Sequence, residues 1–451
     1  MRTRGIRAFL VAVAALLAPM PAVAQSILRD AETEALFRDM SRPLVAAAGL
    51  DPKNVDVVLV NDPQVNAFVV GGQAVYLNSG LINAADSANQ VQGVIAHELG
   101  HVAGGHAVIN PGASAATNIS LLSLLLGAAA AAAGGGEAAM GVLMAGQQAA
   151  MGKFLAYTRE QEASADAAGA QYLSKSGITG KGSLEFFKKL QSLEVRQGYR
   201  VQDGDQFYST HPLTGERIAT LQETYQADPA WNKAPDPKLQ ERFTRIKAKL
   251  FGYLAEPADT LRVYPPTDNS VPAHYARAYA YHKDSQLDRA TAETDALLMT
   301  APDDPYFLEL KGQILLEAGR PAEALEPLRR ATQLTNNQPL IATTFGHALI
   351  ATEDPKHFAE AQDVLRAAVS RDRENPFAWY QLGVIYAANG DMPRARLASA
   401  EQQVLNGQMR EALASAQAAE LGLPQQSPDW IRAQDIEMQA RAEIERGRKR
   451  K

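Results

Sequence analysis

The sequence contains no cysteine, and tryptophan and histidine are scarce, with 3 and 8 copies in 451 residues. The absence of cysteine excludes disulfides, thiolate zinc ligands and cysteine nucleophiles, so a bound metal has to be held by histidine and carboxylate. The formal net charge of −6 gives no reason to expect a nucleic acid partner. Hydrophobic residues at 46% and charged residues at 21% indicate a globular chain, long enough for two or three domains.

The first 24 residues have the pattern of a secretory signal peptide. Three arginines within the first seven residues precede the apolar stretch 8–18, and Ala22-Val23-Ala24 is a small-x-small cleavage site before Gln25. The apolar stretch is too short to span a bilayer comfortably, and no cysteine follows the cleavage site for lipid attachment. We therefore expect an exported, soluble protein of the periplasm.

Two of the few histidines, His97 and His101, lie four residues apart in the segment 91–103, VQGVIAHELGHVA. On a helix both imidazoles project from one side and can bind one metal ion, while Glu98 supplies a carboxylate that can remove a proton from water. The pattern predicts a protease site with one Zn²⁺ per chain rather than a surface helix. Two features support the helix. Ser87 and Gln90 form a capping box at its N-terminus. Apolar residues recur at helical spacing, so one face can be buried; they are Val91, Val94, Ile95, Leu99 and Val102.

The segments before this helix predict one further helix, over 25–49, and then a small sheet. Short β-branched segments at 55–60, 65–70 and 73–77 predict strands, and Gly71-Gly72 predicts a hairpin between the last two. Such a strand pair either pairs with an extended substrate backbone or simply supports the metal helix.

A zinc ion held by two histidines needs a third protein ligand, and Glu162 is our candidate. Asp166, four residues later, can accept a hydrogen bond from a ligand histidine. Glu160 is a competing ligand, and a solvated alanine-rich helix fits the same segment. His211 is a candidate for a fourth ligand or for a contact behind the ligands. Arg217 either stabilises the oxyanion or pairs with an acid.

Residues 113–151 are rich in alanine and glycine, with an apolar stretch at 119–126. We expect buried helices or a mobile lid over the site, with a membrane-contacting element as the alternative, because each half is shorter than roughly 20 apolar residues.

The C-terminal half shows a repeat that starts at Pro305, Pro339 and Pro376, with a weaker copy from Val271. Small and large residues at matching offsets predict tetratricopeptide repeats, whose paired helices stack into a concave surface for polypeptides. A proline-rich linker is expected at 256–270. The histidines of this half are expected to be structural; they are His274, His282, His347 and His357.

The chain is therefore predicted to be mainly α. It combines a zincin-like α+β metalloprotease domain with a small β-sheet, at 25–255, and an α-solenoid of tetratricopeptide repeats, at 271–425. A C-terminal helix and basic tail, at 426–451, complete the expected organisation, and the tail leaves peripheral contact with anionic lipid as an alternative to a solvated end.

The motifs H-E-L-G-H (97–101), E-A-S-A-D (162–166) and T-H-P (210–212) resemble those of the CAAX endopeptidase/HtpX family of gluzincin metalloproteases. N-A-F-V-V-G-G (66–72) resembles the substrate strand of that family, which makes Asn66, Ala67 and Phe68 substrate-binding candidates. With its export signal and repeats, the chain looks like a periplasmic branch of the family.

The resemblance implies zinc ligation by His97, His101 and Glu162, with Glu98 as the catalytic base. It also implies that His211 approaches the zinc and keeps the protease latent. The implied partners are unfolded or misassembled polypeptides and the outer-membrane protein assembly machinery, and the implied role is quality control of that assembly. The alternative is a chaperone or scaffold in which the repeats dominate.

Overall fold

The computed structural model describes residues 26–70, 72–106, 119, 122–123, 136–197, 211 and 214–449. The expected signal peptide lies outside the described residues, as do most of the apolar stretch 119–126 and the neighbours of His211 in the T-H-P motif.

A small mixed sheet forms the first layer of the N-terminal region, in the order β1-β2-β4-β3. Its strands are β1 (Ser26–Leu28), β2 (Val57–Asn61), β3 (Ala67–Val69) and β4 (Val75–Asn78). The predicted hairpin is confirmed, because β3 and β4 pair antiparallel, whereas β2 runs parallel to β4. The helix expected over 25–49 is wrong at its start. Residues 26–28 form β1, whose Ile27 lies opposite Val60 of β2, and the helix begins at Ala31.

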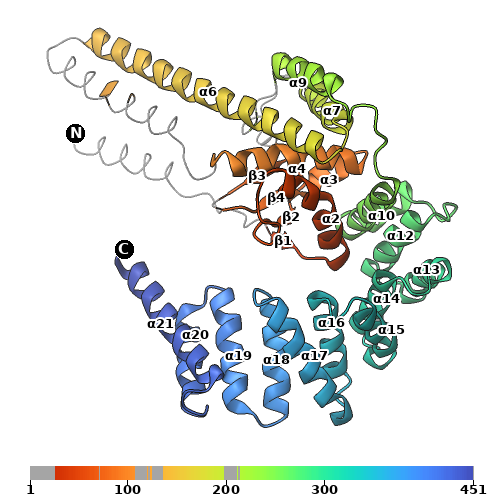
Figure 1. The fold of residues 1–451 in the computed structure, drawn as a ribbon. Coiled ribbons are helices and arrows are strands. Elements are labelled where there is room, and N and C mark those ends of the chain that lie inside the picture. The colour runs from red at the N-terminus through yellow and green to blue at the C-terminus, as the bar shows by residue number, and fades with distance from the viewer. Residues whose placement is uncertain are drawn as a thin grey trace, which may run out of the picture.

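Eight helices among the described residues complete this region and lead into the repeats. They are α2 (Ala31–Ala47), α3 (Ser79–Ala84), α4 (Ala88–Ala103), α6 (Gly136–Lys175), α7 (Lys181–Gln197), α9 (Gly215–Ala227), α10 (Pro237–Leu254) and α11 (Pro257–Val263). The metal helix α4 lies at the centre, between the sheet and α6 (Figure 1). Every residue from Ala88 to His101 is buried, so the helix is covered on all faces and not only along the predicted apolar stripe.

Helix α6 is 40 residues long, and its N-terminal half reaches away from the body of the protein (Figure 1). Met140 and Met144 are 60% and 66% exposed, whereas Ser123 and Ala150 are buried, so the expectation of buried helices holds for only some of the described residues of 113–151. Among the described residues, no helix combines the length and the apolar character that a membrane crossing requires.

The predicted repeats are confirmed as consecutive antiparallel helix pairs. Gly312 and Gly346 show why small residues recur. A Cβ at either position would come within 2.5 Å of a leucine side chain in the paired helix, Leu328 or Leu365. The helices are α12 (Val271–Lys283), α13 (Leu287–Thr300), α14 (Pro305–Glu317), α15 (Pro321–Leu334), α16 (Pro339–Ala351), α17 (Phe358–Arg371), α18 (Pro376–Ala388) and α19 (Met392–Leu405).

Three features differ from the expected organisation of this half. A fifth pair, α20 (Met409–Glu420) and α21 (Pro428–Lys449), continues the stack where an isolated terminal helix was expected. The single-turn helix η1 (Pro355–His357) takes up the insertion before α17. The expected linker at 256–270 contains α11, which packs on α12. The histidines make structural contacts inside the repeats, as His274 does with Glu293.

The repeats curve below the sheet, so that β1 and β2 face the inner side of the solenoid (Figure 1). A cavity of about 820 Å³ lies between the two parts, lined by residues of β1, α2 and β2 and by residues near α16 and α17. Arg29, next to β1, bridges it through an ion pair of 3.0 Å with Asp372.

Candidate metal centre

Helix α4 presents the two predicted ligand histidines to one point. Ser87 caps the helix, since its hydroxyl accepts a hydrogen bond from the Gln90 amide at 3.2 Å, as the capping box predicted. One turn apart, His97 and His101 turn their Nε2 atoms toward each other at 3.2 Å. The two lone pairs therefore point at the same small volume.

Glu162 comes to this point from α6 because the two helices cross without a side chain between them. A Cβ at Gly100 would lie 2.7 Å from the Ala165 carbonyl oxygen, so only glycine permits this approach. The Glu162 carboxylate lies 3.4 Å from Nε2 of His97 and 3.3 Å from Nε2 of His101. The competing candidate Glu160 is exposed and takes no part in this group.

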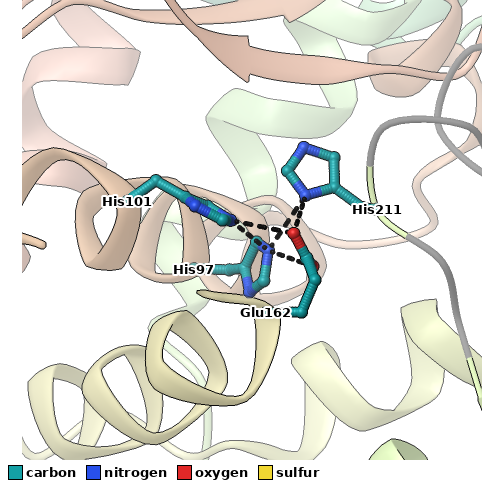
Figure 2. A group of neighbouring side chains, drawn as sticks. All are labelled: His97, His101, Glu162 and His211. Carbon is teal, nitrogen blue, oxygen red and sulfur yellow. Dashed lines mark hydrogen bonds and ion pairs between the residues drawn. The ribbon is translucent and has the colours of Figure 1, made fainter. Parts of the chain in front are cut away.

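His211 is the fourth member of the group (Figure 2). Its Nδ1 lies 3.0 Å from Oε1 of Glu162 and 3.4 Å from Nε2 of His97. One ligand atom from each of the four buried residues lies within 4.8 Å of the others, so a single ion can contact all of them. Two imidazoles with a carboxylate are the ligand set of zinc peptidases, and the residues present fit zinc.

Glu98 is completely buried beside this group, and neither of its carboxylate oxygens has a hydrogen-bond partner among the described residues. Nε2 of His211 lies 3.7 Å from Oε1 of Glu98. A buried carboxylate that accepts no hydrogen bond is costly, so its retention next to the ligands is typical of a functional acid or base.

Asp166 and Arg217 hold the ligands from behind. Nδ1 of His97 lies 3.0 Å from Asp166, which leaves its Nε2 for the metal. The Arg217 guanidinium donates to both oxygens of Asp166, at 2.7 and 2.9 Å, and pairs with Glu162 at 2.9 Å. Arg217 therefore pairs with acids, the second of its two predicted roles.

The electrostatics of the group favour a cation. Burial alone raises the pKa of the Glu162 carboxyl, but hydrogen bonds from the three histidines hold it far below its usual range. Burial alone lowers the pKa of His97, but Asp166 and Glu162 outweigh burial and raise it to about 10. A proton and a metal ion compete for the same Nε2 atom, and the surrounding carboxylates attract both.

The substrate-binding candidates lie at the edge of the sheet, next to α4. Ala67 and Phe68 belong to β3, the edge strand, and the ring of Phe68 stacks on Tyr76 of β4 at 5.1 Å. Asn66 precedes the strand, and its carbonyl accepts a hydrogen bond from the Asn78 amide at 3.0 Å.

His106 is a neighbour of the centre that the sequence analysis did not single out. Its Nδ1 lies 2.9 Å from Nδ1 of the ligand candidate His101. The recurrence of histidine five residues after His101, beyond a Gly-Gly pair, was the available signal.

Comparisons with known proteins agree with this geometry. Residues 13–225 match the model of peptidase family M48, and residues 275–339 and 356–404 match a tetratricopeptide repeat. The beta-barrel assembly-enhancing protease of Escherichia coli (strain K12) is 27% identical over 382 residues, 80% of this chain and 73% of that protein. The Yersinia pestis protein of the same name is 25% identical over 370 residues, 79% and 72% of the two chains.

Metalloprotease LoiP of Escherichia coli is 32% identical over 181 residues, 39% of this chain and 64% of that protein. Among solved structures, YrrB, a TPR protein with an unusual peptide-binding site, is similar at 21% identity. Its TM-score is 0.32, over 39% of this chain and 91% of that one. From the family match, the named relatives and the buried ligand set, this chain is a metalloprotease with a peptidase family M48 domain followed by tetratricopeptide repeats.

Proposed function

We propose that the chain is a zinc endopeptidase of the periplasm that cleaves unfolded or misassembled polypeptides during outer-membrane protein assembly. One observation carries the enzymatic part. Nitrogen and oxygen ligands from α4 and α6 converge, and beside them lies the buried Glu98 carboxylate, whose oxygens accept no hydrogen bond from the described residues. The relatives named beta-barrel assembly-enhancing proteases support the setting, as does the expected export signal.

In this proposal His97, His101 and Glu162 hold the zinc ion. When bound, the zinc polarises the substrate carbonyl and makes the attacking water more acidic. Glu98 accepts the proton of that water and passes it to the leaving amine. This role needs a carboxylate with free lone pairs, and among the described residues neither oxygen of Glu98 has a hydrogen-bond partner. Asp166 keeps the proton of His97 on Nδ1, and Arg217 keeps Asp166 and Glu162 in place.

The substrate backbone pairs with β3 in this proposal. An edge strand has one free row of backbone hydrogen-bonding groups, and β3 adjoins the helix that holds the ligands. Ala67 then bonds the extended polypeptide, while Asn66 and Phe68 hold the strand on β4, so that the scissile bond reaches Glu98.

His211 acts as a latch in the resting enzyme. Its Nδ1 lies with the ligand atoms, so it takes the position that the attacking water needs. Cleavage then requires a client or partner that moves His211 away, and the repeats are the surface that such a polypeptide contacts first.

Replacement of Glu98 by Gln tests the proposal. We expect the variant to keep one zinc per chain, measured by atomic absorption, and to lose cleavage of an unfolded substrate by about 10²–10⁴-fold. Full residual activity would remove Glu98 from its role.

The same variant tests the alternative of a chaperone or scaffold. This alternative is favoured by the position of His211 among the ligand atoms, because an enzyme blocked at rest leaves proteolysis latent. Expression of Glu98→Gln in a deletion strain should leave outer-membrane integrity impaired. Full rescue by this inactive variant would favour the scaffold.

A further inference from the structure

The chain turns back on itself immediately after the metal helix. Gly105 has a φ of +67°, the left-handed conformation that glycine adopts without strain. The Gly105 amide donates to the Val102 carbonyl at 3.1 Å, and the His106 amide donates to the His101 carbonyl at 3.0 Å. This pair of bonds is a Schellman motif, which returns the chain over the last turn of α4.

The turn lays the His106 ring beside the His101 ring. The ring centroids are 5.0 Å apart at an interplanar angle of 72°, and the two Nδ1 atoms are 2.9 Å apart. A Cβ at Gly104 would come within 2.5 Å of the His106 ring, so glycine is needed there to leave room for it. Both glycines of the Gly-Gly-His sequence therefore serve to place this imidazole.

The contact fixes where the protons lie. Nε2 of His101 faces His97 and Glu162, so when His101 binds the zinc ion through this atom, its proton sits on Nδ1. Two Nδ1 atoms at 2.9 Å require one donor and one acceptor. His101 therefore donates from Nδ1 to the Nδ1 lone pair of His106, whose own proton is on Nε2.

We propose that His106 is a positioning residue that holds His101 in its ligand tautomer and orientation. It does for His101 what Asp166 does for His97, with a neutral imidazole in place of a carboxylate. The proposal rests on the proposed function, because it takes His101 as a zinc ligand.

Replacing His106 by Asn or by Leu, two side chains of equal shape, separates the contribution of its hydrogen bond to His101 from that of its packing. Asn places an amide atom where Nδ1 of His106 lies, and Leu has the same branched shape without a polar atom. Phe keeps the volume of the ring. The measurements on the full chain are the zinc dissociation constant, by competition with a chelator at fixed pH, and the visible spectrum of the cobalt-substituted protein.

We expect His106→Leu and His106→Phe to weaken zinc binding by about 10–100-fold and to alter the cobalt spectrum. His106→Asn should restore both to within a few-fold of the original protein, whereas a packing role would leave Asn as weak as Leu. The thermal unfolding midpoint shows which variants fold, and either apolar variant that folds is sufficient for the comparison.

The result that overturns the role of His106 is zinc affinity within twofold of the original protein in both apolar variants, or no rescue by Asn. His101→Ala, measured in parallel, tests the underlying assignment. If that variant binds zinc as tightly as the original protein, the ligand assignment fails and the role of His106 fails with it. If His101→Ala loses zinc but the His106 variants bind zinc as tightly as the original protein, only the positioning role of His106 is wrong.

Discussion

At the scale of single residues, the proposed role of His211 makes its imidazole the group that sets how much of the enzyme is active at rest. If roughly 90% of chains hold His211 on the ligands, its removal should raise basal cleavage about tenfold, because activity follows the open fraction. The measurement is cleavage of an unfolded substrate by His211→Ala without partners. His282→Ala is the control, since that histidine lies in the repeats, where its Nε2 contacts Glu317. A pure loss of activity in His211→Ala would instead indicate that His211 stabilises the oxyanion.

Arg217 is a second residue whose two predicted roles lead to different measurements. Because its guanidinium contacts Asp166 and Glu162, we expect Arg217→Gln to weaken zinc affinity by about 10–100-fold and to leave kcat per bound zinc nearly unchanged.

An oxyanion role for Arg217 predicts the reverse, a fall of about 10²–10³-fold in kcat at full zinc occupancy. Titration of zinc into the variant, with kcat measured at saturation, separates the two outcomes.

A site residue could be predicted from the sequence when its position depends on one short segment of the chain. His97, Glu98 and His101 are recognisable because their geometry depends on one helix alone. Glu162 needed the further argument that two histidines leave a zinc ion short of a ligand. His106 escaped notice because its contact with His101 depends on the left-handed turn at Gly105, whose conformation a Gly-Gly pair permits but does not specify.

At the scale of the element, β3 offers one row of backbone groups to β4 and the other to the outside. The Asn78 amide donates to the Asn66 carbonyl, so in an antiparallel ladder Phe68 also faces β4, while Ala67 and Val69 direct their N–H and C=O groups outward. These outward groups are the ones an extended substrate would bind.

We therefore expect Val69→Pro, which removes one outward N–H at an edge where proline is tolerated, to weaken substrate binding. One lost hydrogen bond of about 1 kcal/mol corresponds to about a fivefold rise in KM, with kcat and zinc content unchanged. Phe68→Pro is the matched control, since it removes a bond of the β3–β4 ladder and should lower the unfolding temperature. An unchanged KM for a folded Val69→Pro protein would show that substrates do not pair with β3.

A helix or strand could be predicted where the periodic pattern of its own residues was long enough. The hairpin and the repeat helices follow from local periodicity, whereas β1 is three residues long and exists as a strand only through pairing with β2. Residues 113–151 were misjudged because an alanine-rich, apolar stretch was expected to be buried as a whole. Residues 136–151 instead begin the long helix α6, on which Met140 and Met144 are exposed.

At the scale of the whole molecule, one buried carboxylate joins the protease region to the repeats. Glu32 of α2 is fully buried and accepts a hydrogen bond from the Tyr275 hydroxyl of α12 at 2.6 Å, across 243 residues of sequence. It also pairs with Arg245 and Lys249 of α10. No local pattern reveals such a cluster, because each partner reads as an ordinary polar position on an amphipathic helix.

Loss of the Glu32 carboxylate should destabilise the contact between the protease region and the repeats. Removal of one partner from a buried ionic cluster costs about 3–5 kcal/mol, because the remaining charges stay buried. The estimate for Glu32→Ala lies at the lower end, since Lys249 keeps Asp30 at 2.5 Å and Arg245 keeps Asp304 at 2.7 Å. The measurement is the free energy of unfolding from urea titration.

Glu323→Ala is the matched control, because Glu323 pairs with Arg320 on an exposed helix surface, where an ion pair contributes about 0–1 kcal/mol. The zinc ligands do not contact Glu32, so zinc affinity should persist in Glu32→Ala while the protease region and the repeats unfold at separate urea concentrations. A single transition of unchanged midpoint would mean that the solenoid is held to the protease by its other contacts.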